Sequence, residues 1–335
     1  MKQAIIKKTF EARATRPEFL TYIQDELKLV EQKLYSNIPQ KDNLLSEIIS
    51  YILKAGGKRI RPSLSLLIAK GTGQVIKKHI VLAELTELIH TASLIHDDII
   101  DSSLLRRGKE TINSLWNNKV SVIAGDYLFA QASVRLGEIE NNEIVKIYAK
   151  VLSDLCCGEI EQFVNKFKTN ISWNYYIDKS MSKTGSLFAA ACKGAAILNE
   201  LSVSEIELAN NYGRCVGIAF QIKDDLLDFT SSAEELGKES CSDLKNGLIT
   251  APTLFALTSE DSRKEQLKQL IESEFKADHE NYDKAIRLVH ELGGCEKAEE
   301  LADKYIREAK NSLSFIKDNV IKELLASAAN FIVKR

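Results

Sequence analysis

Hydrophobic residues along this chain recur at steps of three and four, which is the spacing of one face of an α-helix. In the segment 17–35 they are Phe19, Tyr22, Ile23, Leu27, Val30 and Leu34. Residues 42–54 repeat the pattern and are followed by Gly56 and Gly57, a residue type that commonly ends helices. No period-two alternation of the kind found in strands is sustained. The pattern predicts an all-α protein.

Further helices are expected along most of the chain. The same periodicity predicts them at residues 62–71, 78–102, 119–139, 142–168, 173–199 and 203–230, and in shorter amphipathic stretches at 261–274, 279–292, 296–314 and 317–334. The helices at 78–102 and 203–230 are apolar on more than one face, which is typical of helices inside a bundle.

Nothing in the sequence marks a boundary between domains. No proline stands between Pro62 and Pro252, and because proline breaks helices, its absence permits long ones. One polar segment interrupts the helical pattern, and a loop of that length in a compact domain is usually functional. We expect a single domain over residues 1–335, with a loose tail over 1–16 and a functional loop over 231–249.

Composition and charge exclude several classes of protein. The hydrophobic fraction of 44% and the charged fraction of 27% are ordinary for a globular chain and exclude wholesale disorder. The net charge of −2 gives no electrostatic case for nucleic acid as a partner. No apolar run is long enough for a transmembrane helix, and the first residues lack the apolar core of a secretory signal. The six cysteines have no paired spacing, so we expect free thiols and no zinc site.

A cluster of aspartates is the first sign of chemistry. Asp97, Asp98 and Asp101 follow a strongly apolar helical stretch. On a helix, residues four apart share a face, so Asp97 and Asp101 lie together with Asp98 beside them. One such cluster is compatible with a solvated acidic face. Beside an apolar helix, however, uncompensated carboxylates are costly, and hard cations such as Mg²⁺ prefer their oxygens.

A second cluster has the same spacing. Asp224, Asp225 and Asp228 stand within another apolar stretch, at 216–229. A single motif of this kind is weak evidence for a metal site, and two are much stronger. If the two helices face each other across a cavity, their carboxylates can hold several Mg²⁺ ions over one diphosphate.

Positively charged residues stand close to both clusters in the sequence. They are Lys58, Arg59 and Arg61 in a turn before a helix, Arg106 and Arg107 after the first cluster, Lys183 next to Thr184, and Lys238 in the polar segment. Arginine suits bidentate contacts with a diphosphate, and lysine acts as a point charge. Each residue alone is typical of a charged surface. Their placement beside two acidic clusters favours a diphosphate site.

Taken in order, these motifs resemble the trans-isoprenyl diphosphate synthases, the polyprenyl synthetase family. The resemblance covers roughly residues 50–255 and rests on GGKRIRP, DDIID followed by RRG, the Lys-Thr pair, FQIKDDLLD and the segment GK…DLKNGLITAP. It implies the isoprenoid synthase fold, a single large antiparallel helical bundle around a central cavity, with 231–249 as an active-site loop. It also implies a Mg²⁺-dependent enzyme that condenses isopentenyl diphosphate with an allylic diphosphate, head to tail.

The resemblance further implies a role for each matched residue. The metal ligands are Asp97 and Asp101 on one side and Asp224 on the other, with Asp98, Asp225 and Asp228 nearby. The residues that hold the allylic diphosphate are Arg106, Lys183 and Lys238. The residues that bind isopentenyl diphosphate are Lys58, Arg61, His90 and Arg107. Thr184 and Gln221 lie near the developing allylic cation, and with Lys183 and the aspartates Asp97, Asp98, Asp101 and Asp224 they form the expected catalytic set. No protein base is evident, so we expect the departed pyrophosphate to take the proton.

One position departs from the family's pattern. Many relatives have a lysine in the segment where this chain reads Gly247-Leu248-Ile249-Thr250. Leu248 removes one contact with the diphosphate. Some long-chain synthases are similar to this chain at that point, so we interpret Leu248 as the mark of a subgroup.

The residues before the first cluster bear on product length. Ser93 and Ala92 stand four and five positions before Asp97, where short-chain relatives often carry an aromatic residue as a tunnel floor. Farther along the same face are Ile89 and Thr86, which are also not aromatic. This track favours a product longer than C20, of the solanesyl or prenylquinone side-chain type. The alternative is that Ala92 and Ser93 only pack helices, with the floor set by Tyr127 or Phe129.

Other functions remain open at this point. The main alternative is a geranylgeranyl or farnesyl diphosphate synthase. A terpene cyclase would normally carry an Asn/Ser/Glu type of second metal motif, whereas here that motif is rich in aspartate. A regulatory subunit of a heteromeric synthase usually lacks one acidic motif, and both are intact here.

Partners and location follow from weaker signals. The resemblance implies a homodimer. The basic residues that open the chain are compatible with peripheral contact with anionic lipid, but such a segment is more typical of a loose tail. They are Lys2, Lys7, Lys8, Arg13 and Arg16. We expect a protein of the cytoplasm or of the plastid interior, because no transit peptide is evident and the high use of lysine, isoleucine and asparagine is compatible with a plastid genome.

Overall fold

The computed structural model describes residues 16–41, 43–106, 108–231, 241–275 and 279–334. The first half of this part contains the helices α2 (Glu18–Tyr22), α3 (Gln24–Ser36), α4 (Leu44–Lys54), α5 (Ile60–Thr72), α6 (Lys77–Ile100), α7 (Ile112–Leu115), α8 (Asn118–Ile139) and α9 (Asn142–Val164). The second half contains α10 (Trp173–Ser180), α11 (Ser186–Leu198), α12 (Val203–Thr230), α14 (Ser242–Lys245), α15 (Ala251–Leu257), α16 (Lys264–Glu272), α17 (His279–Glu291), α18 (Gly294–Asn311) and α19 (Asn319–Val333). The prediction of an all-α fold is confirmed.

Three of the long helices, α8, α9 and α12, begin at N-terminal caps that the sequence supplies. The side chain of Asn117 accepts a hydrogen bond from the backbone N–H of Val120 at the start of α8, and Asn141 caps α9 in the same way. Ser202 and Glu205 form a reciprocal capping box at the start of α12. These side chains bind backbone N–H groups that have no partner within the helix, so each helix start follows from its local sequence.

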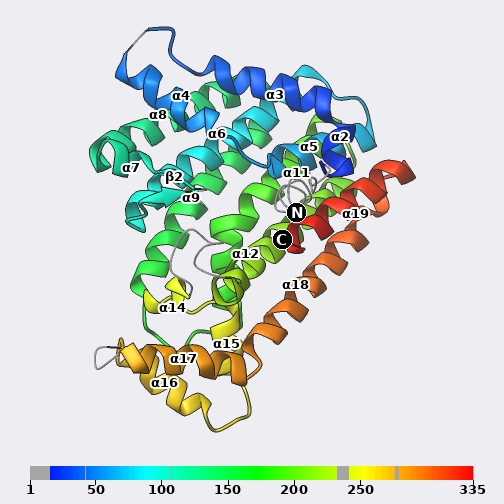
Figure 1. The fold of residues 1–335 in the computed structure, drawn as a ribbon. Coiled ribbons are helices and arrows are strands. Elements are labelled where there is room, and N and C mark those ends of the chain that lie inside the picture. The colour runs from blue at the N-terminus through cyan, green and yellow to red at the C-terminus, as the bar shows by residue number, and fades with distance from the viewer. Residues whose placement is uncertain (1–15, 42, 107, 232–240, 276–278, 335) are drawn as a thin grey trace, which may run out of the picture.

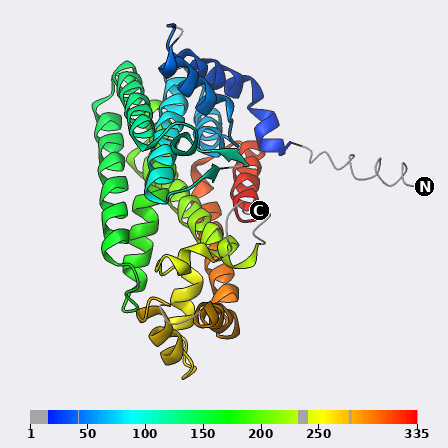
Figure 2. The ribbon, with the colours of Figure 1, turned by 60° about the vertical axis from the view of Figure 1, so that its left-hand side comes forward.

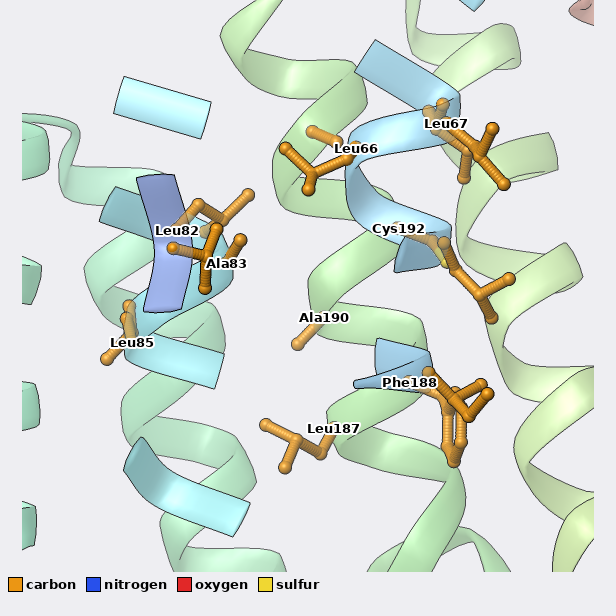
Figure 3. Packing of buried hydrophobic residues seen from close by; sticks show 14 of the residues in the cluster. Leu66, Leu67, Leu82, Ala83, Leu85, Leu187, Phe188, Ala190 and Cys192 are labelled. Carbon is orange, nitrogen blue, oxygen red and sulfur yellow. The ribbon is translucent and has the colours of Figure 1, made fainter. Parts of the chain in front are cut away.

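The core is built around α11 and α12. Figure 3 shows buried side chains of α5, α6 and α11 packed together, with Leu187, Phe188 and Ala190 of α11 among them. Gly213 and Gly217 allow α12 to approach α11 closely, since a Cβ at Gly213 would lie 2.5 Å from the carbonyl oxygen of Phe188. In Figure 1, α12 runs through the middle of the molecule and α16 and α17 lie at one end.

The helices α8 and α9 form an outer edge of the bundle, seen as the long green helices of Figure 2. α6 packs against α8 and is buried around most of its circumference, as its sequence predicted. No helix in the described part of the chain is long and apolar enough to cross a membrane. The free cysteines agree with the prediction, and Cys192 and Cys215 are buried in the core.

Some elements differ from the expected ones. The segment 17–35 is two helices instead of one, because the backbone leaves helical geometry at Ile23 (φ −113°, ψ 24°). Within the expected loop 231–249, the described residues include the short helix α14. A two-stranded hairpin, β1 (Leu105–Arg106) with β2 (Lys109–Glu110), follows α6. Two-residue strands are too short to produce a detectable alternation, so the sequence pattern could not show them.

Candidate active site

The first acidic cluster lies in the last turn of α6. Asp98 is buried, and its Oδ1 accepts a hydrogen bond at 2.7 Å from Nε of Arg106, which stands on β1. Burial raises the pKa of Asp98, and Arg106 opposes that shift. The hairpin is also tied down by Tyr51, whose hydroxyl donates to the carbonyl of Glu110. Asp98 therefore holds Arg106 and the hairpin beside the end of α6.

Asp97 faces a different environment from Asp98. Its carboxyl is largely enclosed, and burial raises its pKa to about 6. Lys183 and Arg106 act to lower that pKa, whereas Glu159 and Asp101 act to raise it. The charged side chains of α6, α9 and the segment around Lys183 therefore lie close enough to interact with one another.

Lys183 and Thr184 stand on a turn of π-helix, Met181–Gly185, between α10 and α11. The single helix expected over 173–199 is thus divided at this pair into α10 and α11. A π-turn inserts an extra residue into a helix and is frequent at functional sites. Nζ of Lys183 lies 2.5 Å from Oε1 of Glu159 on α9. Burial lowers the pKa of Lys183, but Glu159, Asp97 and Asp101 together raise it above its ordinary value, so the ammonium group is charged at neutral pH.

Thr184 connects the π-turn to the second acidic cluster. Its hydroxyl donates to Oε1 of Gln221 at 2.6 Å, and Nε2 of Gln221 donates to Oδ1 of Asp225 at 2.8 Å. The other oxygen of Asp225 accepts from the Tyr176 hydroxyl at 2.7 Å and from the backbone N–H of Ala251 at 3.2 Å. Asp225 is only 2% exposed, and both of its carboxylate oxygens accept hydrogen bonds from other groups of the protein.

The structure separates the three aspartates of the second cluster. Asp228 is buried and accepts hydrogen bonds from the hydroxyl of Ser242 and the backbone N–H of Asp243, so it anchors the start of α14. Asp224 is exposed, one turn beyond Gln221 on α12. The expected metal role of Asp224 is compatible with this position, whereas Asp225 and Asp228 have structural partners.

The donor set fits Mg²⁺ only with help from a ligand. No three histidine, cysteine, aspartate or glutamate side chains of the described residues form a metal-binding group by themselves. Asp97, Asp101 and Asp224 offer only carboxylate oxygens, which are the protein ligands that Mg²⁺ prefers. Mg²⁺ commonly binds one or two carboxylates, keeps several waters and takes further oxygens from phosphate. The arrangement therefore fits a metal that arrives with a diphosphate.

A cationic cavity lies at the start of α5. It encloses about 350 Å³ and brings together Lys58, Arg61 and His90, which the resemblance assigns to one substrate, with Phe220 of α12. The Arg61 guanidinium carbon lies 4.3 Å from the centre of the Phe188 ring. This geometry holds a buried charge by cation–π attraction.

Arg59, in the same motif, has a different role. Its guanidinium pairs with Glu31 on α3 and Glu87 on α6, each at 2.6 Å, and is 9% exposed. Its backbone is left-handed (φ 50°), so these pairs hold the turn that positions Lys58 and Arg61. The sequence did not distinguish Arg59 from its neighbours, because all three residues are cationic.

Two expected site residues, Arg107 and Lys238, lie outside the described residues. The sequence also missed two residues close to the site: Glu159, described above, and Lys179 on α10. Lys179 is 6% exposed, lies 5.4 Å from the centre of the Tyr176 ring, and lines a small cavity with Leu248. Neither residue belongs to a motif with recognisable spacing, so no sequence signal identified them.

The residues of the expected product tunnel are deeply placed. Ala92 and Ile89 on α6 are buried, and the hydroxyl of Thr86 lies 2.6 Å from that of Tyr148 on α9. Tyr127 donates its hydroxyl hydrogen bond to the carbonyl of Asn37, toward α3. Tyr148 is thus a buried aromatic residue in contact with the expected track that the sequence did not single out.

Comparisons with known proteins agree with this geometry. Residues 42–289 match the polyprenyl synthetase family model. A prenyl transferase of Porphyra purpurea is 43% identical, with 96% of this chain and 99% of that protein covered. Solanesyl-diphosphate synthase 2, chloroplastic, of Oryza sativa subsp. japonica is 39% identical, with 96% and 80% covered.

A solved structure gives the same result for the fold. The polyprenyl synthase of Caulobacter crescentus CB15, complexed with calcium and isoprenyl diphosphate, has a TM-score of 0.88 at 29% identity. The match covers 95% of this chain and 97% of that chain. With a family match over most of its length and relatives near 40% identity, the chain belongs to the polyprenyl synthetase family.

Proposed function

We propose that the protein condenses isopentenyl diphosphate with an allylic diphosphate to make an all-trans polyprenyl diphosphate. The observation that carries this proposal is the π-turn. Its Lys183 interacts electrostatically with Asp97 and Asp101 of the first acidic cluster, and its Thr184 is hydrogen-bonded to Gln221 beside the second. One short segment thus joins both clusters around a single site.

Each charge in the site has a task in this reaction. Departure of the allylic diphosphate creates a cation and a negatively charged leaving group, and preorganised charges lower that barrier. Lys183 and Arg106 stand beside Asp97, where they attract and orient the leaving diphosphate. When bound, Mg²⁺ supplies further neutralisation of that charge, with Asp97, Asp101 and Asp224 as its protein ligands.

The second substrate needs a separate anchor. Lys58, Arg61 and His90 line one cavity, which suits the diphosphate of isopentenyl diphosphate. Thr184 and Gln221 present their oxygens to the allylic cation, and holding the double bond beside that cation makes the addition effectively unimolecular. The described side chains include no evident base, so the pyrophosphate that has left takes the proton of the new intermediate.

We further propose a product longer than C20, for a prenylquinone side chain. Support comes from the small side chain of Ala92 at the expected tunnel position and from relatives named for solanesyl and decaprenyl products. Tyr148, hydrogen-bonded to Thr86, is the candidate floor in place of Tyr127 or Phe129. A geranylgeranyl or farnesyl product is the alternative, and it would require a floor nearer to Asp97.

The test uses the pure protein with labelled isopentenyl diphosphate and dimethylallyl, geranyl or farnesyl diphosphate as primer. We expect label to enter a linear polyprenyl chain with Mg²⁺ and not with excess EDTA. A cyclic hydrocarbon made from an allylic diphosphate alone would favour a terpene cyclase. Turnover that appears only after a second protein is added would favour a regulatory subunit.

We also propose a homodimer, built on the edge formed by α8 and α9. This edge exposes apolar side chains at Val122, Ile123 and Val134 on α8 and at Ile160, Phe163 and Val164 on α9. Apolar groups of this size on one face mark an interaction surface. Light scattering coupled to gel filtration should give twice the mass of the chain.

Location and membrane contact are proposals of the same kind. We propose a place in the cytoplasm or the plastid interior, because a relative near 40% identity is named as chloroplastic. Peripheral lipid contact through the basic N-terminal residues would deliver an apolar product to a membrane. All these residues except Arg16 lie outside the described part of the chain, and vesicle flotation with anionic lipid tests the contact.

A further inference from the structure

Glu159 contacts the reaction site although no motif includes it. Its Oε1 lies 2.5 Å from Nζ of Lys183, and both side chains are largely shielded from solvent, at 20% and 26% exposure. The two residues come from different elements, α9 and the π-turn. Glu159 is also close enough to Asp97 to raise the pKa of that carboxyl. Lys183 is therefore paired with a carboxylate of α9 and also interacts electrostatically with a carboxylate of the first acidic cluster.

The packing beneath this pair is tight. Gly158, next to Glu159, has no side chain, and a Cβ there would lie 3.1 Å from Cβ of Ser182 and 3.7 Å from the backbone nitrogen of Lys183. The absence of a side chain lets α9 lie directly against the π-turn. The backbone of Glu159 is thus fixed relative to that of Lys183, and the ion pair results from a rigid contact between two elements.

The chemistry of lysine explains why such a pair is useful. The side chain is long and flexible, and its ammonium group has three hydrogen-bond donors. The ion pair with Glu159 restricts the side chain, and the ammonium group can still donate to oxygens of a diphosphate. Because positioned charges stabilise a leaving group better than mobile ones, the pair prepares Lys183 before substrate binds.

We propose that Glu159 is a positioning residue for Lys183, which it holds in place for the allylic diphosphate. This inference rests on the proposed function, since it uses the role given there to Lys183. Glu159 acts through the lysine and not on the substrate itself. Its removal should therefore affect the reaction only while Lys183 is present.

The experiment is a double-mutant cycle in the full-length protein. The variants are Glu159→Gln, Lys183→Met and the double variant, with Glu159→Asp as the conservative change and Glu161→Gln as the matched control. Glu161 is an exposed glutamate on the same helix, two residues away. The rate constants for primer and isopentenyl diphosphate are measured for each, together with the thermal unfolding midpoint.

We expect Glu159→Gln to lower kcat about tenfold, because a misplaced group can cost that much or more. Its KM for isopentenyl diphosphate should stay unchanged, and Glu159→Asp should recover part of the loss. In the Lys183→Met background, Glu159→Gln should lower kcat by less than about twofold. This non-additivity is expected of two residues that act together. Glu161→Gln should match the wild type.

Three results would overturn the inference. The first is that Glu159→Gln lowers kcat equally with and without Lys183. The second is a kcat for Glu159→Gln equal to or above that of the wild type. The third is a loss of kcat that is accounted for entirely by a lower thermal unfolding midpoint. Failure of the proposed function is a separate outcome, since the wild type and Glu161→Gln would then both fail to condense the substrates.

Discussion

The hydroxyl of Tyr176 on α10 donates a 2.7 Å hydrogen bond to the buried carboxylate of Asp225 on α12. Tyr176 is fully buried and Asp225 is 2% exposed. Burial of a carboxylate is costly unless its oxygens are hydrogen-bonded. This contact, with those from Gln221 and Ala251, explains how an aspartate of an apparent metal motif can lie within the core.

Tyr176→Phe removes this donor without changing the shape of the core. The affected oxygen of Asp225 then keeps only the backbone N–H of Ala251. We expect the free energy of unfolding to fall by about 1–3 kcal/mol, the usual cost of an unsatisfied buried polar group. Urea denaturation measures it, with Tyr175→Phe, a half-exposed neighbour, as the control. Equal losses in the two variants would show that the Asp225 contact contributes nothing specific.

Asp224→Asn should mainly lower the enzyme's activity, whereas Asp225→Asn should mainly lower the stability of the fold. Asp224 is exposed at the site, so Asp224→Asn should keep the free energy of unfolding within about 0.5 kcal/mol of the wild-type value. It should lower Mg²⁺-dependent turnover about a hundredfold, the usual cost of losing one contact with the transition state. Asp225→Asn places an amide nitrogen against the donors of Tyr176 or Gln221. It should cost about 1–3 kcal/mol of stability. A large stability loss in the Asp224 variant would contradict the separation of roles.

The stability of the fold should depend on pH through His79. Burial lowers the pKa of His79, opposed by its contact with the carbonyl of Ala195. Nδ1 also accepts the backbone N–H of Ile76 at the start of α6, so the folded state favours the neutral ring. The unfolded chain takes up the proton first, near its ordinary pKa of about 6.5. The stabilisation is therefore present above that pH and is lost as the pH falls below it.

A comparison of the wild type with His79→Gln isolates this effect. Urea midpoints are measured from about pH 8 to pH 5.5, a range that spans the ordinary histidine pKa. The wild type should lose stability on acidification relative to the variant, while the other histidines contribute equally to both. Parallel curves would mean that His79 does not carry the pH dependence.

Product length should respond to Ala92→Phe. Ala92 is buried on α6, about one turn before Asp97, so a ring there should block a growing chain and shorten the product distribution. Chromatography of the dephosphorylated products measures the change, and Leu29→Phe on the exposed face of α3 is the control. An unchanged distribution from a folded variant would show that Ala92 does not line the tunnel.

Local patterns predicted much of the fold, and the contacts across the bundle explain the rest. The helices were predictable because caps such as Asn117 and Ser202 act within one turn. The break at Ile23 was not, since the helical periodicity of apolar residues continues through it.

The candidate site shows the same division. Asp98 and Asp225 are each the second aspartate of their motifs, and only their contacts, with Arg106 and with Tyr176, distinguish them. Glu159 had no signal because its ion pair is with Lys183, in the π-turn of a different segment. The sequence alone could not show which residues distant in the chain meet.

The most direct test of the account is the product made from labelled isopentenyl diphosphate, an allylic primer and Mg²⁺ by the pure protein. Mass spectrometry of the dephosphorylated product gives its length. We predict linear all-trans polyprenols longer than C20, whose formation stops with EDTA and resumes with added Mg²⁺. No incorporation of isopentenyl units with any primer would contradict the central claim.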